Sequence, residues 1–456
     1  MIKDIKTRIS KLNIDFDFEA YWEIIYLILL AFFVGMRFLL STMFTIYWPK
    51  YFYRTLTVIG VVLVLLHLMM AKDISKKEIA AMLVVTFVFM MSHYVSRYDF
   101  LVDLLILILG AYRVNFRNIL KTYIAVWSVL LVVTIIGAMM GLAENLVYYQ
   151  WQHGEGQRAR MALGICYPTD LAAYVAFLML TYIGFRGFEI LKIELVVMLI
   201  LTIVVYYITD ARTDVACMIV ALLIVCCLKL YLKKHKIDIT NPIIKRIIIA
   251  IPFIVCAGML LATVLFSNDS EVWNAIDTKL NSRLMFSKQA LEDYGITLNG
   301  QYIFEKGAGG TTDSQEYYFF IDSSYISIII KYGVILLVLL CGMLSYSIHK
   351  FEKTKEWGLI VALFVICIHS IMEHHLIQYW YNPFIIAVLS ACNIDKLRIN
   401  KNPRRGKVEL KVEKLGWNGE NINESMFGRL IRWAFNTFIH AKTILERQRK
   451  ILGYFR

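Results

Sequence analysis

Charged residues are scarce in this chain, and so are prolines and cysteines. Only 18% of its 456 residues are charged and 59% are hydrophobic, whereas a soluble domain averages about 25% charged and about 45–50% apolar residues. Eight cysteines are too few for a disulfide scaffold, and six prolines leave few breaks within helices. These shortages exclude a soluble enzyme, a disordered protein and a collagen-like fibre. They predict a polytopic membrane protein.

Long apolar runs predict an all-α fold with about twelve transmembrane helices, because each span needs roughly 20 apolar residues. The first run follows a polar N-terminus, and we expect no cleavable signal peptide. The chain is therefore divided into a cytoplasmic segment 1–21, a transmembrane domain 22–395 and a basic cytoplasmic tail 396–456. The predicted spans are 22–45, 53–71, 79–94, 100–112, 119–141, 169–185, 191–208, 214–230, 246–266, 322–347, 357–372 and 382–394.

The distribution of Lys and Arg predicts the orientation of the chain. The predicted inside segments hold 36 of the 48 basic residues and the predicted outside loops hold 10, which follows the positive-inside rule. With an even number of spans, both termini are then cytoplasmic. The net charge of +13 is spread over short loops, so it indicates membrane topology and not nucleic-acid binding.

Two predicted external loops are long, at 142–170 and 267–322. In the larger loop, apolar residues recur at helical spacing from Glu271 to Glu292, which predicts one amphipathic helix. The tail combines apolar and basic residues over 426–456. That composition is typical of a helix resting on anionic lipid, and a merely solubilising tail is the alternative.

Five polar clusters lie at the outer ends of the predicted spans. A charge near hydrocarbon is costly unless it meets a partner, water or a ligand, so these clusters hold the candidate functional residues. They are Gln157–Gly164 with Tyr167–Asp170, Thr209–Asp214, Asn281–Leu284, Asp322–Tyr325 and His369–Pro383.

Arginines are the common feature of the first three clusters. Each guanidinium offers a planar fork of donors that suits phosphate oxygens. The alternatives are lipid-headgroup contact for the first two arginines and a solvated helix face for the last. The four are Arg158, Arg160, Arg212 and Arg283.

The second cluster is a very short turn. Asp210 and Asp214 are four residues apart, which predicts that they share a helix face with Arg212 between them. A structural ion pair that closes the hairpin is the alternative. In the fourth cluster, Asp322 is a candidate helix N-cap, and Lys331 further along is expected to snorkel towards the membrane surface.

The fifth cluster combines a carboxylate with imidazoles. His369 and Glu373 are four residues apart, and burial of a carboxylate raises its pKa towards neutrality, which makes Glu373 a candidate general base. We expect the adjacent His374 and His375 to point apart on a helix, so a zinc site is not predicted.

Aromatic residues and a proline complete the fifth cluster. Tyr379, Trp380 and Tyr381 fit either an interfacial aromatic belt or a wall on which sugars stack. Asn382 and Pro383 fit the cap and first turn of the last predicted span.

Six motifs, spread over residues 20–395, occur together in this chain. They are Arg160 to Gly164 with Tyr167-Pro168, Asn281-Ser282-Arg283-Leu284, Tyr294 to Gly300, Asp322-Ser323-Ser324-Tyr325, Lys331-Tyr332-Gly333, and Glu373 with Tyr381-Asn382-Pro383-Phe384. This set resembles the Wzy-type bacterial polysaccharide polymerases, within the O-antigen ligase and polymerase group of lipid-linked glycosyltransferases. Two departures are Thr169-Asp170, where the family often has Asn, and Ala211 before Arg212, where it often has Ser.

The resemblance implies a glycosyltransferase of GT-C-like architecture, with a catalytic transmembrane domain and an active site facing outside the bacterial cytoplasmic membrane. The family joins oligosaccharide units carried on undecaprenyl diphosphate into capsular polysaccharide, exopolysaccharide or O-antigen. No metal or other cofactor is implied. The expected partners are the lipid-linked oligosaccharide and the bilayer, with a chain-length regulator and a flippase as further candidates.

The resemblance also implies roles for individual residues. Fixed guanidinium groups of Arg160, Arg212 and Arg283 would stabilise the departing diphosphate. A proton from the acceptor hydroxyl would pass to Glu373, with His374 and His369 as further candidates. The residues expected to bind substrate are Arg158, Asp210, Asp322, Tyr325, His369, His375, Tyr381 and Asn382.

Other functions stay open at the level of the sequence. A ligase of the same group would move the finished glycan to a different acceptor. A twelve-span transporter or flippase would carry coupling charges near the bilayer midplane, and Asp103 is the clear mid-span acid. A scaffold is the weakest alternative, because it leaves the outer arginines without a purpose.

Overall fold

The computed structural model describes residues 18–391, apart from 47–48, 50, 72, 153–155, 233–240, 281 and 306–318. The chain divides into two compact units, Met1–Cys392 and Asn393–Arg456, and the description below concerns the first. The expected tail 396–456, with its helix at 426–456, lies outside the described residues, as does most of the expected segment 1–21.

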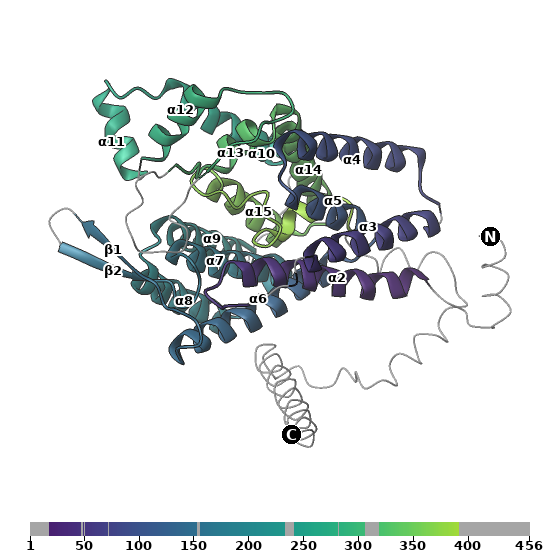
Figure 1. Ribbon diagram of the computed structural model, residues 1–456, viewed down its shortest axis with the longest axis horizontal. Coiled ribbons are helices and arrows are strands. Elements are labelled where there is room, and N and C mark those ends of the chain that lie inside the picture. Colours follow the sequence, from purple (N-terminus) through teal and green to yellow (C-terminus); the bar gives the residue numbers. More distant parts are fainter. Residues whose placement is uncertain are drawn as a thin grey trace, which may run out of the picture. The chain divides into compact units, whose positions relative to one another are not determined.

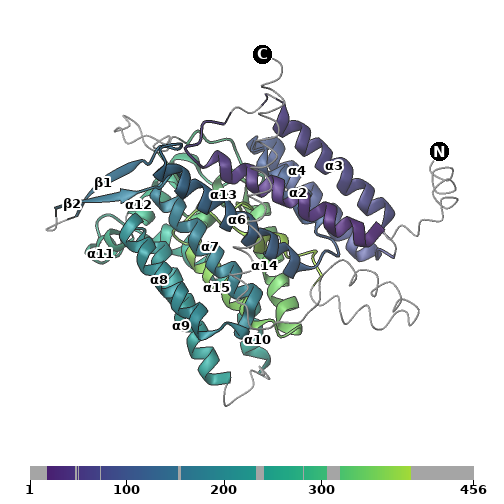
Figure 2. The same ribbon diagram turned by 90° about the horizontal axis from the view of Figure 1, so that it is seen from below.

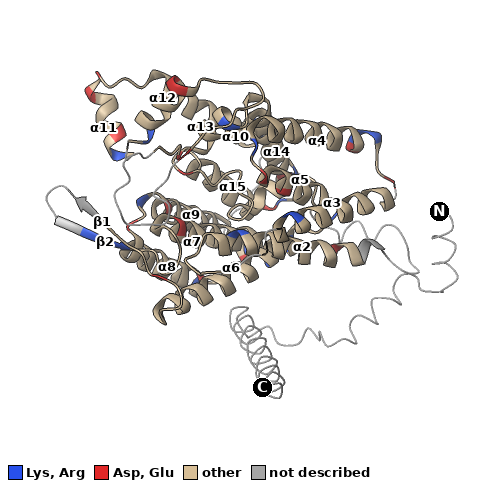
Figure 3. Ribbon diagram, viewed as in Figure 1, with Lys and Arg blue, Asp and Glu red and all other residues tan. Residues whose placement is uncertain are grey.

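The described chain is helical, with one short antiparallel hairpin (Figure 1). Nine of the described helices are long and apolar enough to cross a membrane, so the protein is a helical multi-pass membrane protein, as its composition predicts. Figure 3 shows that charged residues are sparse along these helices. They are α2 (Phe18–Leu40), α3 (Phe52–Met70), α4 (Lys76–Ser96), α6 (Phe116–Met139), α7 (Pro168–Arg186), α8 (Lys192–Thr209), α9 (Arg212–Leu232), α10 (Pro242–Leu265) and α14 (Val334–Lys353).

Three of the twelve predicted spans differ from this set. Two are shorter apolar helices, α5 (Phe100–Gly110) and α15 (Trp357–His369). The last, 382–394, is not an α-helix in its described part, where a 3-10 helix at Pro383–Ile386 is followed by turns. The predicted α-helix is therefore not formed in the described part of this span, whose apolar residues are buried within the protein. Asn382 caps the 3-10 helix, since its Oδ1 accepts from Phe384 N at 3.0 Å.

The predicted span 322–347 is interrupted at a glycine. It forms α13 (Ser324–Lys331) and α14, and Gly333 between them has a φ of +92°. The backbone on either side of the break bonds to the turn before it in sequence, with Gln301 N donating to Lys331 O at 3.0 Å and Val334 N donating to Thr297 O at 3.0 Å. This pairing fixes the loop 267–322 against the start of α14.

Lys331 does not snorkel as the sequence predicted. Its side chain is buried and forms an ion pair with Glu305. The Glu305 carboxylate also accepts a hydrogen bond from Ile321 N at 3.2 Å. A charged partner from the loop 267–322 therefore removes the need for the lysine to reach water.

The predicted amphipathic helix 271–292 is two helices, α11 (Glu271–Lys279) and α12 (Arg283–Tyr294). The chain turns at Ser282, whose φ is +59°. The Asp277 side chain then caps the second helix, because its Oδ1 accepts from Leu284 N at 2.8 Å. Because of this turn, Arg283 is the first residue of α12 and does not lie in the middle of the single helix that was predicted.

The other long predicted loop, 142–170, contains the hairpin β1 (Val147–Gln152) and β2 (Gly156–Met161). Its antiparallel register sets Tyr148 opposite Arg160 and Gln150 opposite Arg158. Strand β2 contacts α8, and basic residues colour part of it in Figure 3. The hairpin therefore carries two of the candidate arginines towards the end of α8.

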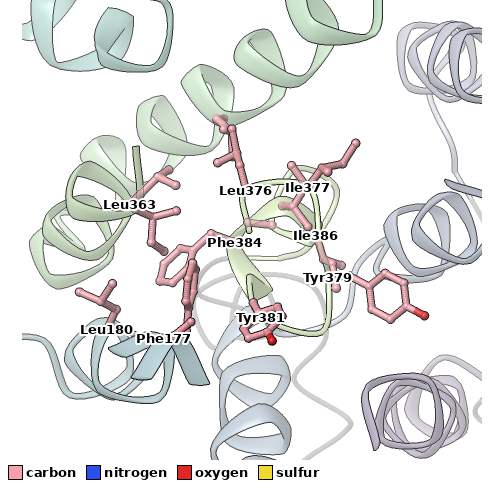
Figure 4. Packing of buried hydrophobic residues seen from close by; sticks show 14 of the residues in the cluster. Phe177, Leu180, Leu363, Leu376, Ile377, Tyr379, Tyr381, Phe384 and Ile386 are labelled. Atoms are coloured by element: carbon pink, nitrogen blue, oxygen red, sulfur yellow. The ribbon is translucent and has the colours of Figure 1, made fainter. Parts of the chain in front are cut away.

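The segment after α15 is buried among helices. α15 packs against α7, α9, α10 and α14, and the 3-10 helix contacts α5, α6 and α14. Figure 2 shows α2, α3 and α4 together on one side of this segment, and α7, α8 and α9 together on another. In Figure 4 the Phe384 side chain lies beside Phe177 of α7 and Leu363 of α15, and all three are fully buried.

Replacing Gly333 with Ala should lower the melting temperature of the detergent-solubilised protein. A Cβ at this position would meet the backbone of Leu298 and Gly300, and a non-glycine residue in this backbone region costs about 1–3 kcal/mol. The matched control is Gly342→Ala in α14, where a Cβ meets nothing within 4 Å. Equal melting temperatures for the two variants would contradict the interlock at Gly333.

Candidate functional site

The candidate site is built on the loop 370–382, which follows α15. The start of α13 is bonded to this loop at three points. Ser324 N donates to Ser370 O at 3.0 Å, Ser324 Oγ donates to Glu373 O at 2.5 Å, and Leu376 N donates to Ser324 Oγ at 3.1 Å. Two segments about fifty residues apart in sequence, each with one carboxylate, are thereby held side by side.

One guanidinium joins those two carboxylates. Arg283 is the first residue of α12, and its Nη1 forms an ion pair with Asp322. Its Nη2 lies 3.4 Å from Glu373 Oε1. The side chains of Arg283, Asp322 and Glu373 are 18%, 11% and 5% exposed, so water screens these interactions only in part. Three of the five predicted clusters thus meet at Arg283.

Glu373 is the buried acid of the site. Burial and, to a smaller extent, the nearby charge of Asp214 raise its pKa, the charges of Arg283, His369 and Arg160 lower it, and the net result is a pKa of about 7. A carboxyl group with a pKa near neutrality can both accept and release a proton at physiological pH. This property is the one expected for Glu373 from the sequence.

The two arginines of β2 lie at the end of α8. Arg160 Nε donates to Thr209 O at 2.8 Å, and Arg158 Nη1 lies 3.0 Å from Asp210 Oδ1. Burial lowers the pKa of Arg160, while the charges of Asp210, Glu373 and Asp214 raise it. Arg160 is therefore within electrostatic reach of both the turn after α8 and Glu373.

The predicted arrangement of Asp210 and Asp214 was wrong. Asp210 ends α8 in a left-handed conformation, before α9 begins at Arg212. It pairs with Arg158 and, at 3.8 Å, with Arg212, whose side chain is 62% exposed. Asp214 instead lies inside α9, buried, with its Oδ1 2.9 Å from His369 Nε2. Asp210 therefore pairs with arginines, whereas Asp214 pairs with His369.

The adjacent histidines do not point apart as predicted. They lie in the loop and not on a helix, and the ring centroids of His374 and His375 are 4.2 Å apart. Burial lowers the pKa of His374 well below its ordinary value and lowers that of His375 to about 3, so both imidazoles are neutral at pH 7. The ligand atoms of both lie within 4.8 Å of an Asp170 carboxylate oxygen.

Three predicted substrate-binding residues have structural roles in this fold. The Tyr325 hydroxyl is buried and donates to Cys367 O at 3.0 Å. Asn382 is buried as well, and its Nδ2 donates to Leu376 O at 2.8 Å. The buried Tyr381 ring stacks on Tyr174 at 4.1 Å. Tyr325 and Asn382 thus bond to the backbone of α15 and of the loop 370–382.

Sequence reasoning named Asp170 and Asp214 but gave neither of them the contacts that the structure shows. Asp170 lies in the first turn of α7 after Pro168, where an acid is expected simply because it stabilises a helix N-terminus. Asp214 was assigned to the wrong partners, since nothing in the sequence links it to His369, which lies 155 residues away. Helix phase suggested a wrong partner for Asp214 and gave no partner for Asp170.

An apolar groove adjoins Arg283. It has a volume of about 280 Å³, and its walls come from α10, α11 and α12 together with Ile371 and Met372. Arg283 is the one charged side chain among the residues that line it. The Arg283 guanidinium, which binds Asp322 and Glu373, therefore also borders an apolar surface.

A second ion pair lies on the other side of the loop. Arg37 Nη2 is 3.1 Å from Asp103 Oδ2, and Thr57 Oγ1 donates to Asp103 Oδ1 at 2.9 Å. Arg37 Nε also donates to the Tyr379 hydroxyl at 3.3 Å. Asp103, the mid-span acid that would fit a transporter, is thus paired with Arg37 and accepts a hydrogen bond from the hydroxyl of Thr57.

A scan against protein-family models and searches of curated proteins and of solved structures found no match to this chain. The resemblance to the Wzy-type polymerases rests on the sequence motifs.

Asp214→Asn should lower the melting temperature of the purified protein more than Asp269→Asn does. The first substitution removes the carboxylate from a buried pair with His369, a change that typically costs about 3–5 kcal/mol. Asp269 is an exposed loop residue and serves as the matched control. If both variants melt at the same temperature, the buried pair does not hold α9 to α15.

Proposed function

We propose that this chain is a glycosyltransferase of the outer face of the bacterial cytoplasmic membrane that polymerises oligosaccharide units carried on undecaprenyl diphosphate. The observation that supports the proposal most is the position of Arg283. Its guanidinium borders the apolar groove on one side and contacts Asp322 and Glu373 on the other. A cation between an apolar groove and two carboxylates suits a substrate in which a diphosphate links a lipid to a sugar.

The lipid and diphosphate fit the first half of this arrangement. A prenyl chain loses unfavourable contact with water when it lies against apolar walls. The diphosphate that follows it would meet the donor fork of Arg283, with Arg160 in electrostatic reach of the same region. The exposed Arg212 and the Asp210-paired Arg158 lie along the neighbouring turn.

Negative charge grows on the diphosphate as the glycosyl bond breaks. Guanidinium groups already fixed by carboxylates and backbone oxygens stabilise that charge without reorganising. Arg283 is fixed in this way by Asp322 and Glu373, and Arg160 by Thr209 O. No nucleotide is needed, because the glycosyl–diphosphate bond itself supplies the driving force.

The acceptor sugar would approach on the Glu373 side. A hydroxyl that attacks the anomeric carbon must lose its proton, and Glu373 is a buried carboxylate placed next to the proposed diphosphate position. His374 follows it directly in the loop and His369 holds Asp214. We therefore assign the role of general base to Glu373 and a supporting role to the histidines.

A ligase is the alternative function, because it would use the same donor chemistry with another acceptor. The transporter is disfavoured, since Asp103 is engaged by Arg37 and Thr57 and the carboxylates Asp322 and Glu373 are tied to Arg283. Purified protein supplied with a lipid-linked repeat unit separates the remaining two. A ladder of lengths supports the polymerase, and one product on a foreign acceptor supports the ligase.

Arg283→Ala should reduce the rate of ladder formation in that assay by about 100-fold or more, because loss of one such donor typically costs roughly 3–4 kcal/mol of barrier. Arg160→Ala should act in the same direction. The control is Lys288→Ala on the same helix α12, because its Nζ donates to Val264 O and pairs with Glu292, and forms no ion pair with Asp322 or Glu373 among the described residues. Ladders of normal rate and length in both arginine variants would reject the proposed diphosphate site.

Glu373→Gln should reduce the rate by about 10²–10⁴-fold, the usual contribution of a general base, while lipid-linked substrate still binds. Gln keeps the shape of the side chain but cannot accept the proton. Glu292→Gln, at a 66% exposed side chain on α12, is the control. A Glu373→Gln enzyme with unchanged rate would exclude the carboxylate from the chemical step.

A further inference from the structure

Three side chains converge next to the proposed general base Glu373 in a pattern typical of metal ligands. They are Asp170 from the first turn of α7 and the consecutive His374 and His375 from the loop 370–382. One ligand atom from each lies within 4.8 Å of the other two. A second group with the same property consists of Asp322, Glu373 and His374.

The two imidazoles have nitrogens suited to a ligand. His375 Nδ1 lies 3.0 Å from Gln378 Oε1, and such an outer partner fixes the ring orientation of metal-binding histidines while Nε2 faces the metal. His374 Nδ1 is buried and has no hydrogen-bond partner within the described chain. A buried polar atom without a partner carries a desolvation cost that a ligand would relieve.

The balance of charge selects the first group over the second. Arg283 already binds Asp322 and Glu373. Asp170 has a side-chain hydrogen bond with Tyr381, and its charged neighbours Glu373 and Asp214 are both acids. No ion pair to Asp170 occurs among the described residues. A carboxylate with two acidic neighbours in a buried position attracts a cation.

We propose that Asp170, His374 and His375 bind a divalent transition-metal ion of the Zn²⁺ class. Two imidazole nitrogens and one carboxylate favour Zn²⁺ over Mg²⁺, which prefers a shell of oxygen atoms. Three protein ligands leave a further coordination position open. The ion ties the start of α7 to the loop that carries Glu373.

This site goes beyond the resemblance, which implies no metal. The site depends on the conformation of the loop 370–382, which holds the rings of His374 and His375 side by side. It does not depend on polymerisation. Metal binding can therefore be measured whether or not the protein extends a glycan, so failure of the metal site and failure of the proposed function give separate results.

The test uses the full chain without a polyhistidine tag, in detergent and stripped with a chelator. Zn²⁺ is then titrated against a fluorescent chelator, and bound metal is counted by elemental analysis. We expect one Zn²⁺ per chain and an increase in melting temperature on binding, with no comparable effect of Mg²⁺. Failure of the wild-type chain to retain Zn²⁺, or equal binding of Mg²⁺, overturns the proposal.

Variants locate the ion. Gln378→Leu should weaken Zn²⁺ binding by about 10–100-fold, the usual effect of losing an outer partner, and Asp170→Asn should weaken it at least as much. His93→Gln is the histidine control, because that ring bonds to Tyr98 O in another part of the fold. Unchanged affinity in both Asp170→Asn and Gln378→Leu, or an equal loss in His93→Gln, would place the ion elsewhere and reject the site.

Discussion

The guanidinium of Arg283, shared between Asp322 and Glu373 at a largely dry position, is the interaction on which the rest of the site depends. A buried ion pair adds little net stability, since desolvation offsets most of its attraction, but removing one partner is costly because a charge is left uncompensated. The main effect of this cluster is therefore to position the segments that carry it, and not to add stability. It fixes where α12, the start of α13 and the loop after α15 lie relative to one another, and it does so at the edge of an apolar groove.

The cluster forms because two helices that the apolar pattern predicts as continuous, 271–292 and 322–347, are each divided into two. Ser282 turns the chain so that a helix begins at Arg283, and the break at Gly333 lets the backbone around it bond to the turn formed by residues 297–301. The loop 370–382 stays out of helical conformation because Ser324 and Asn382 satisfy its backbone groups. Polar contacts within the protein thus replace the hydrogen bonds that a continuous span would have made.

The sequence predicts the fold class well, because scarce charge and long apolar runs are properties of composition. It also singles out Arg283, Asp322 and Glu373, which the structure brings together. It does not predict the breaks at Ser282 and Gly333, since the apolar pattern runs through both. It cannot link Asp214 to His369 or Asp170 to the histidines, because those pairs depend on how α7, α9 and α15 pack, and helix periodicity carries no information about partners that are far apart in the chain.

The hairpin has a consequence for how this protein can change over time. Arg158 and Arg160 are two residues apart on β2, and alternate residues of a strand face the same side. Both side chains therefore face the end of α8 in one register, and a shift of a single residue would turn both of them away together. Insertions or deletions within β2 are tolerable only in even steps, so the spacing of these arginines is governed by strand parity as much as by their own chemistry.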